Sequence, residues 1–193
     1  MKKQNLFLII LFLVFYSNSA FSENVRKRIP IETKNILFLL EVDSNNKIYQ
    51  TYLGPKVNPD EIPNFNQNIQ DIYPNFGTSF INEPAIMVTH ADGNTSTEIL
   101  YIKHSIEKNS DGSTTICIAT KDSYYPFYVN IYFKTFYNYD IIEEWAEIYH
   151  KEKNAITIAK YASSYLSFQS NSYFLTQFYG NWANEMNMQE SKL

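Results

Sequence analysis

The pattern of hydrophobic and polar positions predicts a chain built mainly from β-strands. Its clearest stretch is 125–137, where apolar side chains alternate one by one with more polar ones. The apolar members are Phe127, Val129, Ile131 and Phe133. Because a period of two places alternate residues on one face of a strand, we expect this face to line a hydrophobic core.

Turn residues divide much of the remaining chain into further strands. Turns containing Asp, Asn or Gly at 43–46, 91–94 and 108–113 separate short apolar runs. The other predicted strands are 35–42, 47–53, 85–90, 95–106, 113–121, 155–168 and 172–178. Such turns favour antiparallel hairpins, so we expect a meander in which each strand pairs with the next. Alternation in one run places Leu100, Ile102, His104 and Ile106 on the same face.

The run 139–153 fits either a helix or a strand. Asp140 and Glu143 have the spacing of a helix-capping box, and apolar residues within the run fall on one helical face. Local propensity therefore favours a helix. A helix would interrupt the series of strands, however, and this consideration favours a strand.

Two segments fit neither pattern. Five of the seven prolines lie between residues 55 and 84, and the run 57–72 is also rich in Asn and Gln. We expect this run to form a long surface loop, a type of segment that often carries function. Residues 186–193 are polar, and we expect them to form a tail outside the folded unit.

Residues 1–22 have the layout of a secretory signal peptide. A basic start precedes an apolar run at 6–16, and small residues at Ala20 and Ser22 suit cleavage before Glu23. The apolar run is short for a membrane span, and an uncleaved anchor is the alternative. We therefore expect an exported protein, either periplasmic or extracellular.

Composition limits the classes of partner. The length predicts one domain, covering 23–185, ahead of the polar tail. The net charge is −4 and the chain has no basic cluster, so we expect no nucleic-acid partner. Cys117 is the single cysteine, so no internal disulfide can form.

Aromatic residues make up 17% of the chain, and they have two competing interpretations. Exposed rings can form a sugar-binding surface. Rings in sheet proteins more commonly fill the core or pair across strands. The sequence alone leaves both uses open.

No set of residues predicts catalysis, a metal site or a cofactor. Glycoside hydrolysis requires two cooperating carboxylates. Glu143 and Glu144 are adjacent, and in a strand they would point to opposite faces. His90, His104 and His150 lie on different predicted strands without partners at ligand spacing, so we expect hydrogen-bonded structural roles for the first two.

Several short motifs resemble the N-terminal domain of the family 36 α-galactosidases (melibiases). They are Tyr73-Pro74-x-Phe76-Gly77, Glu83-Pro84-Ala85, Asp92-Gly93, Tyr139-Asp140-x-Ile142 and Gly180-x-Trp182-x-x-Glu185. The resemblance spans 36–185 and implies an all-β, antiparallel β-sandwich of the supersandwich type, which this chain would carry in part. It also implies a strand at 139–153.

The resemblance places catalysis elsewhere. In that family two aspartates of a separate (β/α)₈ barrel hydrolyse α-galactosides, so the implied partners are a barrel that this chain lacks and the sugars bound by the parent enzyme. It also allows a homo-oligomer. The alternative, from a different class, is a free-standing secreted carbohydrate-binding or adhesive β-sandwich.

The two substrate-binding candidates are Asn82 and Trp182. Many family members have Asp-Phe-Arg where this chain has Phe80-Ile81-Asn82, so one charged pair is missing. We expect Trp182 to be mainly structural, packing beside Gly180. On that interpretation, Trp182→Ala would lower the free energy of unfolding by about 3–5 kcal/mol.

Overall fold

The computed structural model describes residues 27–63, 70–78, 83–168 and 172–192. In these residues the regular structure consists of β-strands and two short 3-10 turns, Pro59–Glu61 (η1) and Tyr137–Tyr139 (η2). The expected all-β class is confirmed. Within the same ranges, no helix is long and apolar enough to cross a membrane.

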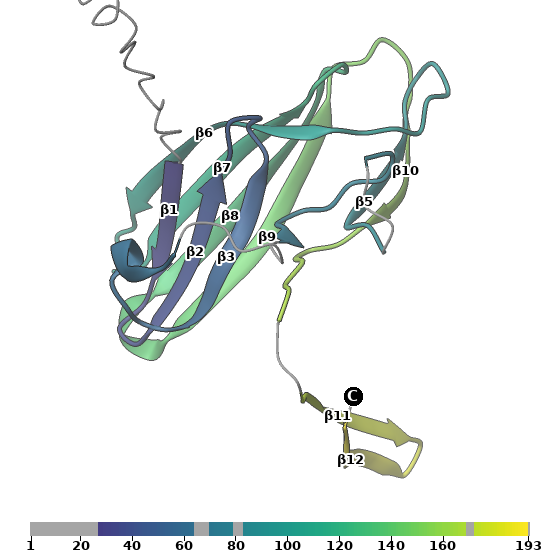
Figure 1. Ribbon diagram of the computed structural model, residues 1–193. Helices are drawn as coiled ribbons and strands as arrows, with labels where there is room; N and C mark the ends of the chain where they lie inside the picture. The colour runs from purple at the N-terminus through teal and green to yellow at the C-terminus, as the bar shows by residue number, and fades with distance from the viewer. Residues whose placement is uncertain (1–26, 64–69, 79–82, 169–171, 193) are drawn as a thin grey trace, which may run out of the picture.

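Two four-stranded antiparallel sheets face each other (Figure 1). The strands of the first sheet, in spatial order, are β1 (Lys27–Glu32), β2 (Ile36–Val42), β3 (Ile48–Pro55) and β4 (Gln70–Asp71). Those of the second are β6 (Ile99–Lys108), β7 (Thr114–Asp122), β8 (Phe127–Phe136) and β9 (Ile141–His150). This arrangement is a β-sandwich, as predicted.

The core lies between the inner faces of these sheets. In β8 the predicted alternation is complete: Phe127 and Phe133 are fully buried, and the residues between them alternate between buried and half-buried. Phe133 meets Phe38 of the opposite sheet edge to face, with ring centroids 5.5 Å apart. Stacked apolar faces of this kind supply most of the free energy that favours folding.

The outer face of β2 is also covered. Glu41, on that face, is fully buried, and its Oε1 accepts a hydrogen bond from Arg28 Nε at 2.8 Å. The same guanidinium donates to the carbonyls of Pro59 at 2.6 Å and Ile62 at 3.0 Å. Arg28 therefore joins the η1 segment of the predicted loop to the sheet.

Strand β9 confirms the strand expected at 139–153. It pairs with β8 along its whole length, from Ile141 to His150. Asp140 does not begin a helix; it follows the η2 turn as its C-cap, in a left-handed conformation with φ 54°. Its carboxylate accepts hydrogen bonds from Thr33 Oγ1, Asn35 N and Asn35 Nδ2 at 2.7–2.8 Å. The residue that looked like a cap thus joins the two sheets.

The expected continuous meander is wrong at β5 (Ile86–Thr89). β5 pairs with β10 (Thr157–Tyr161), which follows β9, rather than with β6. The predicted tight turn does form, with Gly93 at φ 88° and Gly93 N donating to His90 O at 2.9 Å. Beyond it the chain turns toward another loop, where Thr97 N donates to Phe76 O at 2.9 Å.

A bulge changes the predicted face of β6. The register shifts between Tyr101 and Lys103, which leaves Ile102 half exposed. His104 and Ile106 still share a face, opposite the inward residues of β7. Leu100 and Ile102 do not join them, because one extra residue reverses the alternation.

The expected polar tail at 186–193 is wrong for residues 186–192. β11 (Phe174–Asn181) and β12 (Asn184–Lys192) form a separate two-stranded antiparallel sheet. The sequence of β12 is mostly polar and therefore did not predict a strand. A polar strand can still pair in a hairpin, because the backbone supplies the hydrogen bonds between the two strands.

Candidate functional site

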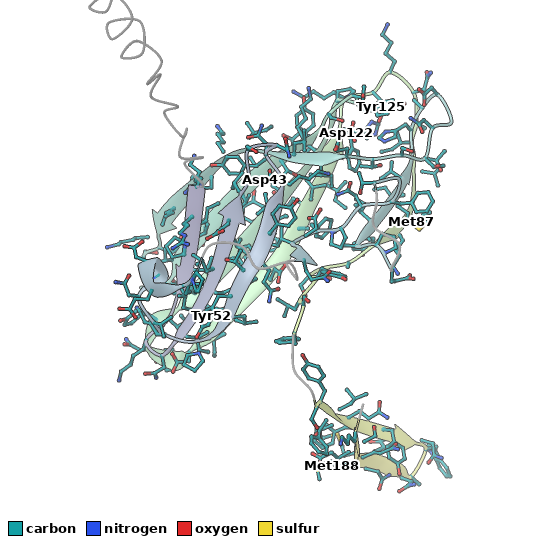
Figure 2. The ribbon with its side chains drawn as sticks, in the orientation of Figure 1. Asp43, Tyr52, Met87, Asp122, Tyr125 and Met188 are labelled. Atoms are coloured by element: carbon teal, nitrogen blue, oxygen red, sulfur yellow. The ribbon has the colours of Figure 1, made fainter. Side chains whose placement is uncertain are left out.

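The hairpin formed by β11 and β12 is the most exposed folded part of the described chain. It stands apart from the two facing sheets (Figures 1 and 2), and none of its residues belongs to the hydrophobic core. All eight residues of β11 are exposed. An isolated two-stranded hairpin is only marginally stable in water, so this element requires a surface to pack on.

The two faces of the hairpin differ in polarity. Phe178 lies directly opposite Met188, and Phe174 lies on the same face, four residues before Phe178. The exposed fraction is 61% for Phe178, 66% for Met188 and 63% for Phe174. Between these apolar side chains, Thr176 donates a hydrogen bond to Glu190 on the same face. The other face pairs Gln177 with Gln189 and also exposes Leu175 and Tyr179. Exposed apolar groups gathered on one face mark a surface for docking. Apolar and polar residues do not alternate one by one through 174–179, so the sequence alone does not predict this face.

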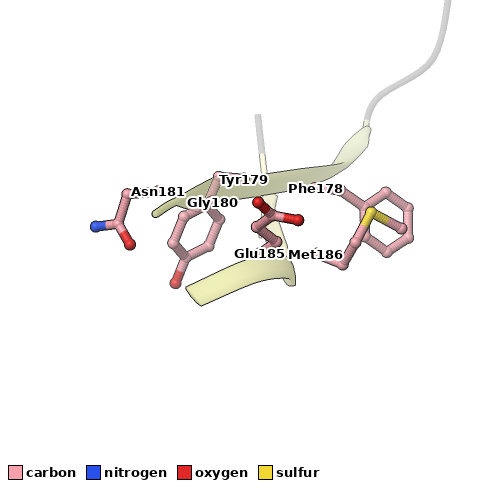
Figure 3. A pocket seen from close by; sticks show the side chains of 6 residues that line it. All are labelled: Phe178, Tyr179, Gly180, Asn181, Glu185 and Met186. Atoms are coloured by element: carbon pink, nitrogen blue, oxygen red, sulfur yellow. The ribbon is translucent and has the colours of Figure 1, made fainter. Parts of the chain in front are cut away.

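A shallow hollow of about 320 Å³ lies near the turn of the hairpin (Figure 3). Its lining residues are Phe178, Tyr179, Gly180, Asn181, Glu185 and Met186. In Figure 3 the side chains of Phe178 and Met186 lie together at one end. The hollow therefore extends the apolar face toward the turn.

Gly180 is required by the close approach of the two strands. A Cβ at this position would lie 2.7 Å from Glu185 Cα, next to the register shift between Tyr179 and Asn181. Any larger residue would push the strands apart. The glycine and glutamate of the Gly-x-Trp-x-x-Glu motif thus meet in the structure.

Trp182 is placed differently from the prediction. It follows Asn181, which pairs with Asn184, so it lies in the turn of the hairpin, and its exposed fraction is 94%. The expected packing beside Gly180 is therefore wrong. The ring projects from the turn, and none of the described strands covers it. The other candidate, Asn82, lies outside the described residues.

The buried histidine is His90, and it belongs to a hydrogen-bonded network. Its Nδ1 lies 2.8 Å from Glu152 Oε1, and its Nε2 lies 3.2 Å from Thr97 Oγ1. Its ring stacks on Tyr125 with centroids 3.7 Å apart. Glu152 Oε2 also accepts from Ala91 N at 2.9 Å. Burial raises the pKa of Glu152, but the hydrogen bonds from Ala91 and His90 outweigh it and hold this pKa below its usual value.

This network stabilises the fold and does not form a reactive site. A carboxylate, an imidazole and a hydroxyl in series resemble a catalytic triad, but Thr97 and His90 are both buried, so no substrate reaches them. Tyr125, whose ring stacks on His90, is held in turn by Asp122, whose Oδ1 accepts a hydrogen bond from Tyr125 N at 2.7 Å (Figure 2). The predicted structural role of His90 agrees with this geometry. Glu152 could not be predicted as its partner, because 62 residues separate the two.

The adjacent carboxylates of β9 point to opposite faces, as predicted. Glu143 is exposed, whereas Glu144 lies on the inner face, opposite Phe133. Burial raises the pKa of Glu144 to about 7, although a hydrogen bond from the Tyr165 backbone opposes the rise. Its Oε1 has no hydrogen-bond partner within the described ranges. Those ranges also contain no group of three or more His, Cys, Asp or Glu arranged to hold a metal ion.

Comparison with solved structures shows the same fold in three α-galactosidases. The α-galactosidase from Lactobacillus brevis is 18% identical, with a TM-score of 0.72 over 87% of this chain and 27% of that one. The galactosidase domain of the α-galactosidase–sucrose kinase AgaSK is 19% identical, with a TM-score of 0.79 over 86% of this chain and 28% of that one. AgaA from Geobacillus stearothermophilus is 16% identical, with a TM-score of 0.72 over 86% and 28%.

The chain thus spans little more than a quarter of the length of these enzymes. A comparison with curated protein sequences gave no match. The sequence profile of the glycosyl hydrolase family 36 N-terminal domain matches residues 31–193, which include the hairpin and nearly all of the sandwich. The chain therefore belongs to the family of glycosyl hydrolase family 36 N-terminal domains.

Proposed function

We propose that this chain is the non-catalytic N-terminal domain of an exported family 36 α-galactosidase. The sandwich supports a separate catalytic barrel, and the apolar face of the hairpin packs against the rest of the enzyme. The observation that carries this proposal is the hairpin itself. It lies within the family match and exposes Phe174, Phe178 and Met188 together.

The geometry of the adjacent carboxylates of β9 supports the assignment of catalysis to another part of the enzyme. Retaining glycosidases hold two carboxyl groups about 5 Å apart, and inverting ones hold them about 6.5–9.5 Å apart around the scissile bond. On β9, Glu143 and Glu144 face opposite sides of the sheet, and Glu144 is turned toward the core. These two carboxylates cannot flank one glycosidic bond.

The docking role follows from stability. In the described residues the hairpin strands pair only with each other, and Phe174, Phe178 and Met188 remain exposed on one face. Burying three large apolar side chains would contribute roughly 1.5–3 kcal/mol each. A partner that covers this face would therefore fix the hairpin and couple the sandwich to the catalytic domain.

Export is proposed from residues 1–22. They carry a basic start, a short apolar run and a small-residue cleavage site. Expression in a bacterial host should release a protein whose N-terminal sequence begins at Glu23 in the periplasm or the medium. A product that remains in the membrane with Met1 intact would instead identify an uncleaved anchor.

The central test uses a chromogenic α-galactoside. Purified residues 23–193 should give no hydrolysis above background, and turnover that survives repurification would overturn the non-catalytic assignment. The DNA downstream of codon 193 should be sequenced in parallel, because a reading frame that continues into a barrel would supply the partner.

Docking is then tested in the longer enzyme. Phe178→Ser should lower its melting temperature or its activity, because Phe178 lies on the apolar face of the hairpin. Gln177→Ser, one residue away on the polar face, is the matched control. Equal behaviour of the two variants would contradict docking through this face.

A further inference from the structure

The outer face of the second sheet carries two pairs of stacked aromatic rings between β8 and β9. Tyr128 stacks on Tyr149, with centroids 4.7 Å apart and planes inclined by 4°. Tyr132 stacks on Trp145, with centroids 5.0 Å apart and planes inclined by 2°. Both pairs are directly opposite in the strand register. The inner positions of β8 hold the core, so these rings belong to the other, solvent-facing side.

A polar pair lies between the aromatic pairs. Asn130 faces Glu147 at the intervening outward position of the register. Tyr132 Oη donates to Glu147 Oε2 at 2.8 Å, which fixes the direction of an exposed carboxylate. The face thus presents rings, then an amide and a carboxylate, then rings again along one direction.

The rings of β9 lie at the edge of the sheet, where Tyr149 is exposed and Trp145 is half-buried. β9 is the last strand of its sheet, so no described strand lies beyond the ring faces of Trp145 and Tyr149 that look away from β8. Tyr149 has an exposed fraction of 44%. The two residues are four positions apart on one strand, a separation of about 13 Å. Glu147 projects between them.

We propose that this edge of the second sheet binds a neutral oligosaccharide, through Trp145 and Tyr149 with Glu147 between them. Apolar faces of sugar rings fit flat aromatic faces, and sugar hydroxyls suit a carboxylate and an amide held at fixed positions. Two ring platforms about 13 Å apart require a ligand with more than one sugar ring. This site goes beyond the proposed supporting role and does not depend on it.

Preorganisation strengthens this assignment. Each β9 ring is already held by the ring stacked behind it, and Glu147 is held by the Tyr132 hydroxyl. A ligand would therefore immobilise few side chains, which lowers the entropic cost of binding.

The charge of the face selects among ligands that stack on rings. Glu143 and Glu147 lie on the outer face of β9. Lys134 and Lys121 lie on the same face of β8 and β7, and Lys151 Nζ lies 5.9 Å from the Tyr128 ring centroid, so the face carries charges of both signs and no run of basic residues along one strand. Nucleic acids carry a phosphate at every base and require basic residues along the backbone path. Anionic membranes also attract basic rather than acidic faces. A neutral ligand with many hydroxyls suits this combination of rings and carboxylates.

The test uses the intrinsic fluorescence of Trp145. The chain has two tryptophans, so Trp182→Phe makes Trp145 the only one. We would titrate this variant with stachyose and, separately, with maltotetraose. A saturable shift or quench of Trp145 emission with either sugar supports the site. No saturable change with either sugar up to high concentration, in a protein with a cooperative melt, would overturn it.

Variants then locate the site. Tyr149→Ala, in the Trp182→Phe background, should weaken binding at least tenfold, whereas Tyr139→Ala should leave it unchanged. Tyr139 is also exposed but lies in η2, at the other end of β9. If Tyr149→Ala fails to fold, Glu147→Lys preserves the rings and should weaken binding at least threefold. Equal affinity for all folded variants would leave the rings with a sheet-stabilising role only.

Discussion

Both polar atoms of the Gln50 side-chain amide form hydrogen bonds with the backbone of Ser167. Gln50 Nε2 donates to Ser167 O at 2.6 Å, and Gln50 Oε1 accepts from Ser167 N at 3.1 Å. The side chain therefore acts as a neighbouring strand would, across 117 positions of sequence. The same segment covers the core near Tyr73, whose hydroxyl donates to Ala162 O at 2.7 Å. Residues 162–168 thus form a strap, which is fastened to the first sheet by side chains.

Removing this fastening should loosen the strap. Gln50→Ala leaves a half-buried N–H and C=O of Ser167 without these partners, so we expect the free energy of unfolding to fall by about 1–3 kcal/mol. Chemical denaturation measures the loss, and hydrogen exchange at the Ser167 amide should accelerate. Gln177→Ala in the exposed hairpin is the control and should stay within about 0.5 kcal/mol of wild type. Unchanged exchange at Ser167 would show that the strap is held by other contacts.

Glu144 should make stability fall as the pH rises. Its pKa is about 7 in the folded protein, raised from 4.5 mainly by burial. Below pH 4.5 both states hold the proton, and between 4.5 and 7 only the folded state does, so the free energy of unfolding decreases through that window. Burial raises the pKa of Asp71 in the same direction, to about 6.

The variant Glu144→Gln tests this directly. The free energy of unfolding of this variant should change less with pH and should exceed that of wild type at pH 8 by about 3 kcal/mol, because the pKa shift from 4.5 to about 7 spans roughly 2.5 units, each worth about 1.4 kcal/mol. Glu143→Gln is the matched control, since Glu143 is the exposed neighbour on the outer face. Melting curves of wild type and both variants, recorded from pH 4 to 8, measure these differences in stability. Parallel profiles for wild type and Glu144→Gln would mean that Glu144 ionises freely in the folded state.

The His90–Glu152 pair should show strong coupling. Glu152→Ala removes acceptors from both His90 and Ala91 N in a buried site, so we expect a loss of about 2–4 kcal/mol. His90→Gln should lose a similar amount. The double variant should then lose clearly less than the sum of the two, as for residues of one network. Additive losses in this double-mutant cycle would indicate that the two side chains act independently.

The elements that the sequence predicted are those decided by local pattern. The alternation in β8 was sufficient to place Phe127 and Phe133 in the core, because the inward positions from 127 to 133 are all apolar and the outward ones between them are polar or aromatic. β9 was harder, since Asp140 and Glu143 imitate a helix cap. The decisive contact of Asp140 is with Thr33 and Asn35, more than a hundred residues away.

Pairing and exposure depended on distant partners and could not be predicted. β5 pairs with β10 even though a well-formed turn follows β5, because backbone groups after the turn bond to the loop at Phe76. The motif around Gly180 was visible in the sequence, and its close strand approach agrees with the need for glycine. Whether the Trp182 ring is buried depends on a packing partner, which the local sequence does not indicate.

The exposure of Trp182 leads to the last prediction. A ring with an exposed fraction of 94% loses little contact when it is truncated, so Trp182→Ala should change the free energy of unfolding of this chain by less than about 0.5 kcal/mol. Phe133→Ala is the contrasting variant, because its ring is fully buried against Phe38, and it should lose about 3–5 kcal/mol. Urea titration of the two variants and wild type under one condition measures both changes. A large loss for Trp182→Ala would mean that the ring packs on the sandwich or on a second copy in solution. In an enzyme that includes the catalytic domain, the same substitution should become destabilising if the turn of the hairpin is part of the docking surface.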